Sequence, residues 1–113
     1  MIKILHNNRC SKSRSGLELL EKSGKPFEIV QYLENTLSFE DLKEIINLLS
    51  IKPIDLVRKN EAIWKTEFKH KILNDDQIIE AMVKNPKLIE RPIVINGHKA
   101  VIGRPTEKII EII

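Results

Sequence analysis

The first third of the chain contains two short strand-forming segments on either side of one amphipathic segment. Ile2–Leu5 is rich in β-branched residues and predicts a strand, and Phe27–Leu33 predicts a second one. Between them, leucines recur at helix-like spacing from Ser13 onward, and Gly24 follows as a C-terminal signal. The pattern therefore predicts a β-α-β unit, and we expect its two strands to run parallel, as strands joined by a crossover helix do.

The middle of the chain carries mainly helix signals. Ser38, followed three residues later by Asp41, resembles a capping box at the start of a helix. The apolar face of this helix comprises Phe39, Leu42, Ile45, Ile46 and Leu49. Lys52-Pro53 predicts a further short helical segment, because proline is tolerated in the first turn of a helix.

One more helix is predicted before the C-terminal third. Asn74, with Gln77 three positions later, indicates a capped start, and Asn85-Pro86 indicates the end. The pattern between Glu61 and Lys71 is weaker, so we expect mostly irregular structure or a broken helix there. We therefore predict a helical insertion over about residues 38–88.

The C-terminal part predicts a hairpin followed by a helix. Ile93–Ile95 and Lys99–Ile102 are strand-forming runs on either side of Asn96-Gly97. Asn-Gly in this position predicts a type I′ turn, in which both central residues need a positive φ. Thr106–Ile113 then predicts a closing helix with three residues on one side: Ile109, Ile110 and Ile113.

The order of predicted elements indicates an α/β fold. It reads β-α-β, then helices, then β-β-α. A four-stranded mixed sheet with helices on both faces is the simplest way to bury these segments, and this is the thioredoxin-like arrangement. A length of 113 residues is typical of one domain, so we expect a single domain over residues 1–113 that includes the helical insertion.

Composition excludes several classes of protein. The fractions of 42% hydrophobic and 31% charged residues are typical of a soluble globular protein. Met1–Leu5 is too short an apolar segment for a signal peptide, and no stretch is long enough to span a membrane. We therefore expect a cytoplasmic location and no membrane partner. The single cysteine also excludes an internal disulfide.

The charge pattern favours a small anion over a nucleic acid as the partner. The chain has 19 basic and 16 acidic residues, hence a net charge of +3, and no run of basic residues. An aromatic fraction of 4% leaves few platforms on which single-stranded bases could stack. We therefore expect no nucleic-acid partner.

Cys10 is the main candidate for chemistry. It lies between the first predicted strand and helix, where the unpaired N–H groups of a helix N-terminus stabilise an anion. His6 and the basic residues around it favour the thiolate further, and Ser13 could donate to the sulfur or cap the helix. A lone cysteine is most often a small buried hydrophobe. The basic residues around Cys10 are Arg9, Lys12 and Arg14. These polar neighbours favour a reactive thiol over a buried one.

Three arginines are candidates for binding an oxyanion. Arg58, Arg91 and Arg104 each end an apolar segment, and the last two precede a proline. Guanidinium groups match the geometry of an oxyanion in a way that lysine cannot. Arg91-Pro92 is also a candidate cis peptide that would aim the neighbouring backbone at the Cys10 loop. We expect no metal site, because the three histidines lack ligand spacing with a partner.

Four separated segments resemble the signature segments of the glutaredoxin-coupled arsenate reductase family. They are His6–Arg14, Leu56–Asn60, Glu90–Val94 and Gly103–Glu107. The similarity extends over essentially the whole chain with the segments in the right order. It implies a thioredoxin-like fold and a role in arsenic detoxification.

The resemblance also implies roles for individual residues. Cys10 matches the cysteine that attacks arsenate in this family. The three arginines that bind the oxyanion and stabilise the intermediates match Arg58, Arg91 and Arg104. Assistance in forming the thiolate is implied for three residues of the cysteine loop: His6, Ser13 and Arg14.

The implied reaction needs a second thiol. Reduction of arsenate to arsenite takes two electrons, and each thiol that joins a disulfide supplies one. Because Cys10 is the only cysteine, the hypothesis assigns the second thiol to glutathione, which forms a mixed disulfide with Cys10. Glutaredoxin then restores Cys10 by thiol exchange. The expected partners are therefore arsenate, glutathione as co-substrate and glutaredoxin, with no bound cofactor.

Two alternatives remain open within the same family. One is a glutathione-dependent thiol reductase that acts on a substrate other than arsenate. The other is a non-enzymatic regulatory module like the Spx-type proteins, which usually show Cys-x-x-Cys, whereas this chain has Ser13 in the second position.

Overall fold

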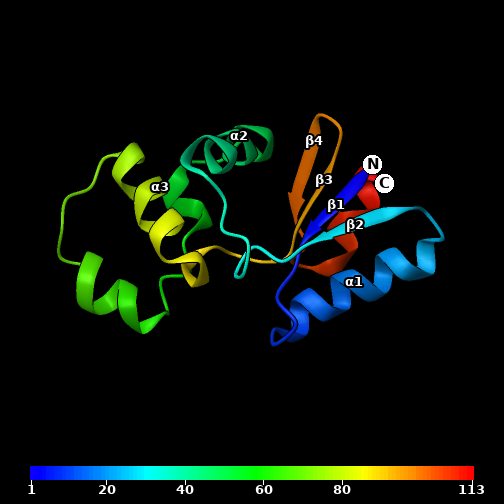
Figure 1. Cartoon of the computed structure of the whole chain (residues 1–113), viewed down its shortest axis with the longest axis horizontal. Coiled ribbons are helices and arrows are strands. Elements are labelled where there is room, and N and C mark those ends of the chain that lie inside the picture. The colour runs from blue at the N-terminus through cyan, green and yellow to red at the C-terminus, as the bar shows by residue number, and fades with distance from the viewer. The chain divides into compact units, whose positions relative to one another are not determined.

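A four-stranded sheet forms from the segments that predict strands. The computed structural model describes residues 1–113, with strands β1 (Ile2–Leu5), β2 (Phe27–Val30), β3 (Ile93–Asn96) and β4 (Lys99–Ile102). Their order in the sheet is β2-β1-β3-β4 (Figure 1). β1 is parallel to β2 and antiparallel to β3, and β4 is antiparallel to β3. This mixed sheet with its helices confirms the predicted thioredoxin-like fold class.

The chain forms two compact units. Unit 1 comprises residues 1–35 and 91–113 and contains the sheet, and unit 2 comprises residues 36–90. The limits of unit 2 lie close to those of the predicted helical insertion. That the whole chain behaves as one domain stays a prediction.

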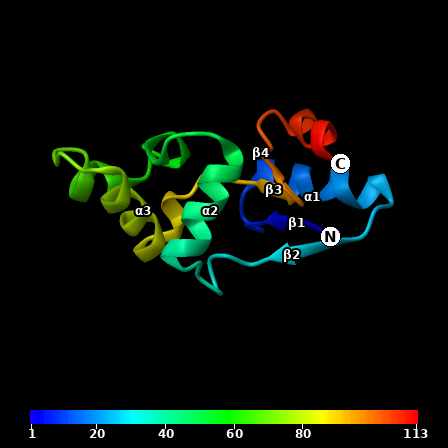
Figure 2. The ribbon, with the colours of Figure 1, turned by 90° about the horizontal axis from the view of Figure 1, so that it is seen from above.

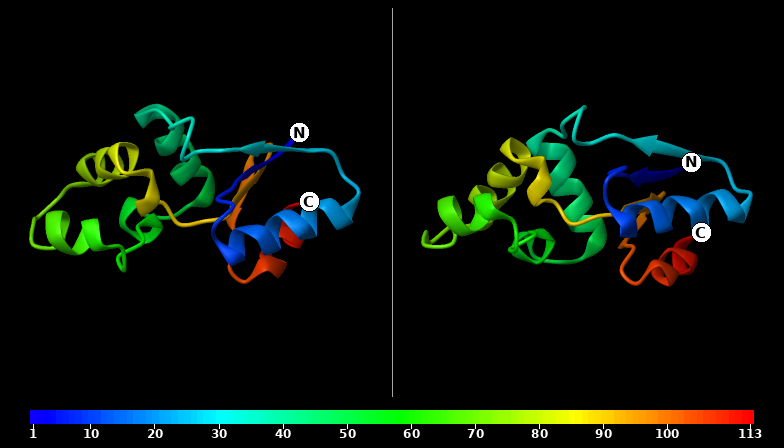
Figure 3. Two further views of the ribbon diagram at one scale, coloured as in Figure 1. Left: turned by 60° about the horizontal axis from the view of Figure 1, so that its bottom comes forward. Right: turned by 90° about the horizontal axis from the view of Figure 1, so that it is seen from below.

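Two helices of unit 1 cover one face of the sheet. They are α1 (Ser11–Ser23) and the 3₁₀-helix η4 (Thr106–Ile112), which lie side by side (Figure 3). α1 ends at Gly24, whose φ of 73° is the left-handed conformation that glycine adopts at little cost. The buried cluster that joins both helices to the sheet comprises Ile2, Ile4, Leu20, Val94 and Ile109.

The closing helix differs from its prediction in the face that it buries. A 3₁₀-helix has about three residues per turn, so residues three apart lie on the same side. Ile109 and Ile112 accordingly pack against the core cluster, whereas Ile110 is 61% exposed. The prediction that Ile110 shares the apolar side with Ile109 is therefore wrong, because it assumed the spacing of an α-helix.

The hairpin between β3 and β4 is present, but its turn differs from the predicted one. Asn96 pairs with Lys99, so the two central residues of the turn are Gly97 and His98. Gly97 has a φ of 62°, and Ser50 is the only residue other than glycine with a positive φ. This is the pattern of a type II′ turn, in which only the first central residue needs a positive φ. The predicted type I′ turn centred on Asn96 is wrong.

Unit 2 is helical, and its two α-helices begin at the predicted caps. In α2 (Phe39–Leu49), the side chain of Ser38 accepts a hydrogen bond from the backbone N–H of Asp41. In α3 (Asp75–Lys84), Asn74 and Gln77 form a reciprocal capping box. Such caps satisfy N–H groups that have no partner inside the helix. α3 packs against α2 in this unit (Figure 2).

Short helical turns complete unit 2. η1 (Pro53–Leu56) confirms the segment predicted after Lys52, and η3 (Pro86–Leu88) follows α3. The weakly patterned region between Glu61 and Lys71 contains one short π-helix, η2 (Trp64–Phe68), in agreement with the prediction of a broken helix. None of the helices has both the length and the apolar character needed to cross a bilayer.

The packing of η4 is tested by a pair of neighbouring substitutions. Ile109 is fully buried, so Ile109→Ala should lower the free energy of unfolding by about 2–5 kcal/mol, measured by urea denaturation. Ile110→Ala is the matched control, and its effect should stay within about 0.5 kcal/mol because the side chain is exposed. Equal losses for the two variants would contradict the 3₁₀ geometry.

Candidate functional site

Cys10 lies where the loop after β1 enters α1. It is the N-cap residue of α1, with extended backbone angles, and its carbonyl accepts the first helical hydrogen bond from the N–H of Arg14 at 3.0 Å. Its own N–H donates to the carbonyl of Asn7 at 3.0 Å. The thiol is free and only partly exposed. The local fold therefore places the sulfur at the N-terminal end of a 13-residue helix.

The surroundings of Cys10 favour its ionised form. Burial of the thiol raises its pKa, but the backbone N–H groups of Ser13 and Lys12 and the guanidinium of Arg91 lower it. The lowering contributions prevail, and the pKa of Cys10 lies below its ordinary value. The side chain of Cys10 forms no capping hydrogen bond, so the two N–H groups act on the sulfur through the charge at the helix end. A thiolate is the nucleophilic form of cysteine, so the site favours a reactive sulfur.

The strand pairing explains why two arginines distant in sequence meet at Cys10. Ile93 pairs with Ile102, so the residues just before β3 and just after β4 lie at the same end of the hairpin. Leu5, the last residue of β1, also pairs with Ile93, which brings the loop after β1 to that end. Arg91 and Arg104 therefore lie beside the Cys10 loop.

The guanidinium groups of Arg91 and Arg104 lie close to the sulfur of Cys10. Nη2 of Arg104 lies 3.6 Å from Sγ of Cys10, and its Nε donates to the backbone carbonyl of Arg91 at 2.8 Å. The side chain of Arg91 also faces the thiol closely enough to lower its pKa, by hydrogen bonding and by its charge. Both arginines precede a cis proline. An oxyanion that reached the sulfur would therefore meet two guanidinium groups, which bind such groups with charge-assisted hydrogen bonds.

Glycine at position 16 lets α1 approach the cis proline after Arg91. A Cβ atom at Gly16 would lie 2.9 Å from Cγ of Pro92, closer than such atoms pack. Gly103 is similarly constrained, because a Cβ there would lie 3.0 Å from both Pro92 and Ile109. The close packing of helix and hairpin thus depends on two residues without side chains.

His6 and Ser13 form a buried pair beneath the Cys10 loop. His6 is 1% exposed and Ser13 is fully buried. Nδ1 of His6 lies 2.6 Å from Oγ of Ser13, and the same oxygen accepts a hydrogen bond from the N–H of Asn7 at 2.9 Å. The Ser13 hydroxyl thus fixes the loop, and the group of Ser13 that acts on the sulfur is its backbone N–H.

Arg14 supports the same loop from the exposed side. Its Nη1 donates to the backbone carbonyl of Asn8 at 2.9 Å. The structure therefore places Arg14 as a brace of the loop that carries Cys10.

Arg58 belongs to unit 2, where two carboxylates hold its guanidinium. Its Nε lies 3.5 Å from Oε1 of Glu61, and its Nη1 lies 3.2 Å from Oε1 of Glu90. A backbone hydrogen bond also joins the segment of Arg58 to that of Glu90, because the N–H of Arg58 donates to the carbonyl of Leu88 at 2.7 Å. The structure thus brings Arg91 and Arg104 to Cys10 and orients Arg58 within its own unit.

The sequence pattern indicated no role for the carboxylates of Glu61 and Glu90 or for the backbone N–H of Lys12. Glu61 follows Arg58 by three residues, a spacing typical of local ion pairs, which was an available signal. No group of three His, Cys, Asp or Glu side chains that could hold a metal ion is present.

Comparison with known proteins shows the family to which this chain belongs. The model of the ArsC family matches residues 5–112. The chain belongs to the ArsC family. This confirms the family resemblance that the four sequence segments indicate.

Several known proteins match this chain over nearly its full length. The Escherichia coli K12 protein named "Uncharacterized protein YfgD" is 42% identical over 99% of this chain and 96% of its own length. A protein of Neisseria meningitidis named arsenate reductase is 40% identical over 96% of this chain and 94% of its own length. The solved structure titled arsenate reductase from Vibrio cholerae has a TM-score of 0.93 and 39% identity, covering 99% of this chain and 97% of that one.

The ionisation of Cys10 is tested by its rate of alkylation at different pH values. The midpoint should lie below that of an ordinary thiol, and Arg91→Ala should move it upward because a positive charge and a hydrogen-bond donor are lost. The control Lys108→Ala changes an exposed residue of η4 and should leave the midpoint unchanged.

The same pKa shift has a consequence for stability. Because the pKa is lowered on folding, ionisation of Cys10 stabilises the folded chain at pH values above the pKa of the unfolded thiol. This contribution is lost as the pH falls through the lower pKa of the folded chain. An alkylation midpoint at or above that of an unfolded thiol would contradict the described site.

The buried pair beneath the loop is tested by Ser13→Ala. This change leaves the Asn7 N–H and the His6 ring without their shared oxygen, so it should lower the free energy of unfolding by about 1–3 kcal/mol in urea denaturation. Ser15→Ala removes an exposed hydroxyl from the same helix and should have a much smaller effect. Equal effects would show that the pair does not anchor the loop.

Proposed function

We propose that this ArsC-family protein reduces arsenate to arsenite with Cys10 as the nucleophile. The observation that carries the proposal is the partly exposed Cys10 sulfur, whose pKa is lowered by the end of α1 and by Arg91, with Arg104 3.6 Å away. The family membership and the relatives named arsenate reductase support the substrate assignment. Arsenate is a tetrahedral oxyanion, and two guanidinium groups beside a thiolate suit it.

In the first proposed step, the Cys10 thiolate attacks arsenic. A sulfur–arsenic bond forms, and one arsenate oxygen leaves as water after protonation. Arg91 and Arg104 stabilise the negative charge on the remaining oxygens. The family resemblance assigns the same role to Arg58, and within unit 2 its guanidinium pairs with Glu61 and Glu90.

In the second proposed step, the thiol of glutathione attacks the sulfur of Cys10 and loses its proton. The sulfur–arsenic bond breaks, its electron pair stays on arsenic, and arsenite leaves. Arsenic gains two electrons, and the two sulfurs lose them as they form the mixed disulfide. This step requires a thiol from outside the chain, because Cys10 is its only cysteine.

The third proposed step restores the enzyme. A thiol of glutaredoxin attacks the glutathione sulfur of the mixed disulfide and releases the Cys10 thiolate. The cycle uses glutathione as a co-substrate and no bound cofactor. It needs the reduced glutathione of the cytosol, so we propose a cytoplasmic location.

We assign supporting roles to three residues of the cysteine loop. His6 and the Ser13 hydroxyl hold the loop from beneath, and Arg14 holds it from the exposed side. Their joint effect is to keep the N–H groups of α1 and the sulfur in the arrangement that lowers the pKa of Cys10.

A coupled assay with arsenate, glutathione and glutaredoxin tests the proposed function. Cys10→Ser should abolish turnover. Arg104→Lys keeps the charge but loses the fork of donors, so it should lower kcat/KM for arsenate by about 10-fold or more. Lys108→Gln is the control at an exposed position of η4, and it should leave turnover and kcat/KM for arsenate unchanged.

The outcomes also separate the alternatives. Full arsenate turnover by Cys10→Ser would exclude the mechanism. A wild-type protein that exchanges disulfides with glutathione but does not turn over arsenate would be a glutathione-dependent thiol reductase. A protein that does neither and binds a protein partner would be a regulatory module of the same family.

A further inference from the structure

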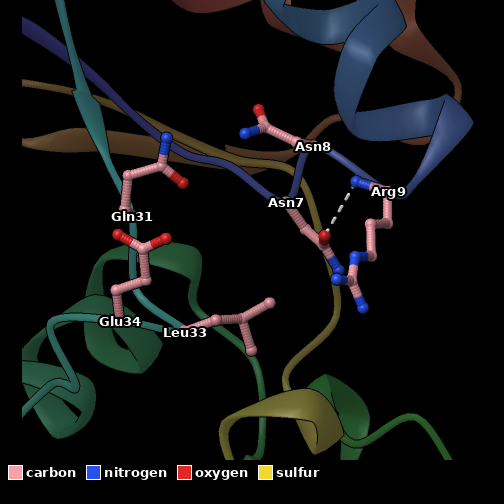
Figure 4. A pocket seen from close by; sticks show the side chains of 6 residues that line it. All are labelled: Asn7, Asn8, Arg9, Gln31, Leu33 and Glu34. Atoms are coloured by element: carbon pink, nitrogen blue, oxygen red, sulfur yellow. Dashed lines mark hydrogen bonds between the residues drawn. The ribbon is translucent and has the colours of Figure 1, made fainter.

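A pocket next to the Cys10 loop is lined by residues that have no role in the proposed steps. It encloses about 390 Å³ between the loop after β1 and the segment after β2 (Figure 4). Its lining residues are Asn7, Asn8, Arg9, Gln31, Leu33 and Glu34. The pocket, named here the Arg9–Glu34 pocket, therefore offers one cation, one anion, three amides and one apolar side chain.

The two charges of the pocket are not used within the chain. The ion pairs of the chain involve other residues, and Arg9 takes part in a hydrogen bond only through its backbone N–H. The side chains of Arg9 and Glu34 are exposed and lie on opposite walls (Figure 4). Both charges are therefore free to meet a ligand that carries the opposite charges.

Backbone hydrogen bonds hold both walls of the pocket. On one wall, the side chain of Asn7 accepts from the N–H of Arg9 at 3.0 Å, and the N–H of Asn7 donates to Ser13 at 2.9 Å. On the other wall, the carbonyl of Gln31 accepts from the N–H of Glu34 at 3.0 Å. The backbone of both walls is therefore ordered before a ligand binds, and binding has to order mainly the side chains.

The pocket adjoins the nucleophile along the chain. Arg9 directly precedes Cys10, and consecutive Cα atoms are about 3.8 Å apart. The carbonyl of Asn7, from the same wall, accepts the hydrogen bond from the N–H of Cys10. Cys10 itself does not line the pocket, but the pocket wall ends at the residue next to it.

The lining suits the amino-acid end of a small peptide. A carboxylate and an ammonium on one carbon atom would pair with the guanidinium of Arg9 and the carboxylate of Glu34. The amides supply further donors and acceptors. Glutathione carries such an end on its γ-glutamyl residue, and its thiol is on the next residue. We propose that the Arg9–Glu34 pocket binds the zwitterionic γ-glutamyl end of glutathione.

This assignment rests on the proposed use of glutathione and adds the site that selects it. The thiol of glutathione is one residue from the γ-glutamyl end, a reach of about 7 Å, and Arg9 directly precedes Cys10 in the chain. The pocket accordingly favours glutathione over small thiols that lack the two charges.

Disulfide exchange in the absence of arsenate tests the pocket separately from reduction. The Cys10 thiolate attacks one sulfur of glutathione disulfide, a new disulfide forms with Cys10, and one glutathione thiolate leaves. The rate constant, followed by intact mass, is divided by that for the uncharged hydroxyethyl disulfide. This ratio cancels any change in the reactivity of Cys10 itself.

Glu34→Gln and Arg9→Gln should each lower this ratio about 10-fold, because each removes one charge-assisted contact. Glu21→Gln and Lys108→Gln, exposed residues elsewhere in unit 1, should leave it unchanged.

An unchanged ratio in the two pocket variants would overturn the proposal, including the case in which both reagents slow equally. A lowered ratio in a protein that does not reduce arsenate would refute the proposed function and leave the glutathione site standing. The two hypotheses can therefore fail independently.

Discussion

The site depends on the balance between burial of the Cys10 sulfur and the donors that face it. Burial alone disfavours a thiolate and raises the pKa of the group, whereas the end of α1 and Arg91 lower it by more. The backbone N–H groups are fixed by the helix, so they supply their partial charge without reorganisation. Removing either the helix end or Arg91 would raise the pKa of the thiol.

The fold supplies this balance through strand register. The hairpin of β3 and β4 brings positions 91 and 104 to one end of the sheet, and the pairing of β1 with β3 brings the cysteine loop to the same end. Gly16 then allows α1 to approach Pro92. The pairing of the strands and the close contact of α1 with Pro92 thus bring together the three segments that carry Cys10, Arg91 and Arg104.

Local signals in the sequence predicted much of the fold. Ser38 and Asn74 begin helices as predicted, since side-chain capping depends on residues only three positions away. The two errors concern the type of a helix and the type of a turn, which local residue signals did not distinguish. Ile110 is exposed because η4 is a 3₁₀-helix, and the hairpin turn is centred on Gly97 and His98.

The part of the site that depends on neighbouring residues in the chain was also predictable. The place of Cys10 before a helix is a local feature, and its basic surroundings are visible in the sequence. The hydrogen bond of Ser13 to His6 and the placement of Glu34 opposite Arg9 depend on tertiary structure. Spacing along the chain does not reveal which side chains face each other across two loops.

In the proposed reaction, Cys10 and one glutathione together deliver two electrons to arsenic. A single-turnover experiment tests it most directly: the protein is mixed with arsenate and reduced glutathione without glutaredoxin, then quenched and analysed by intact mass and arsenite assay. The proposed reaction should give one arsenite per protein molecule and convert the chain to a Cys10–glutathione mixed disulfide. Arsenite released while Cys10 stays reduced and open to alkylation would contradict it.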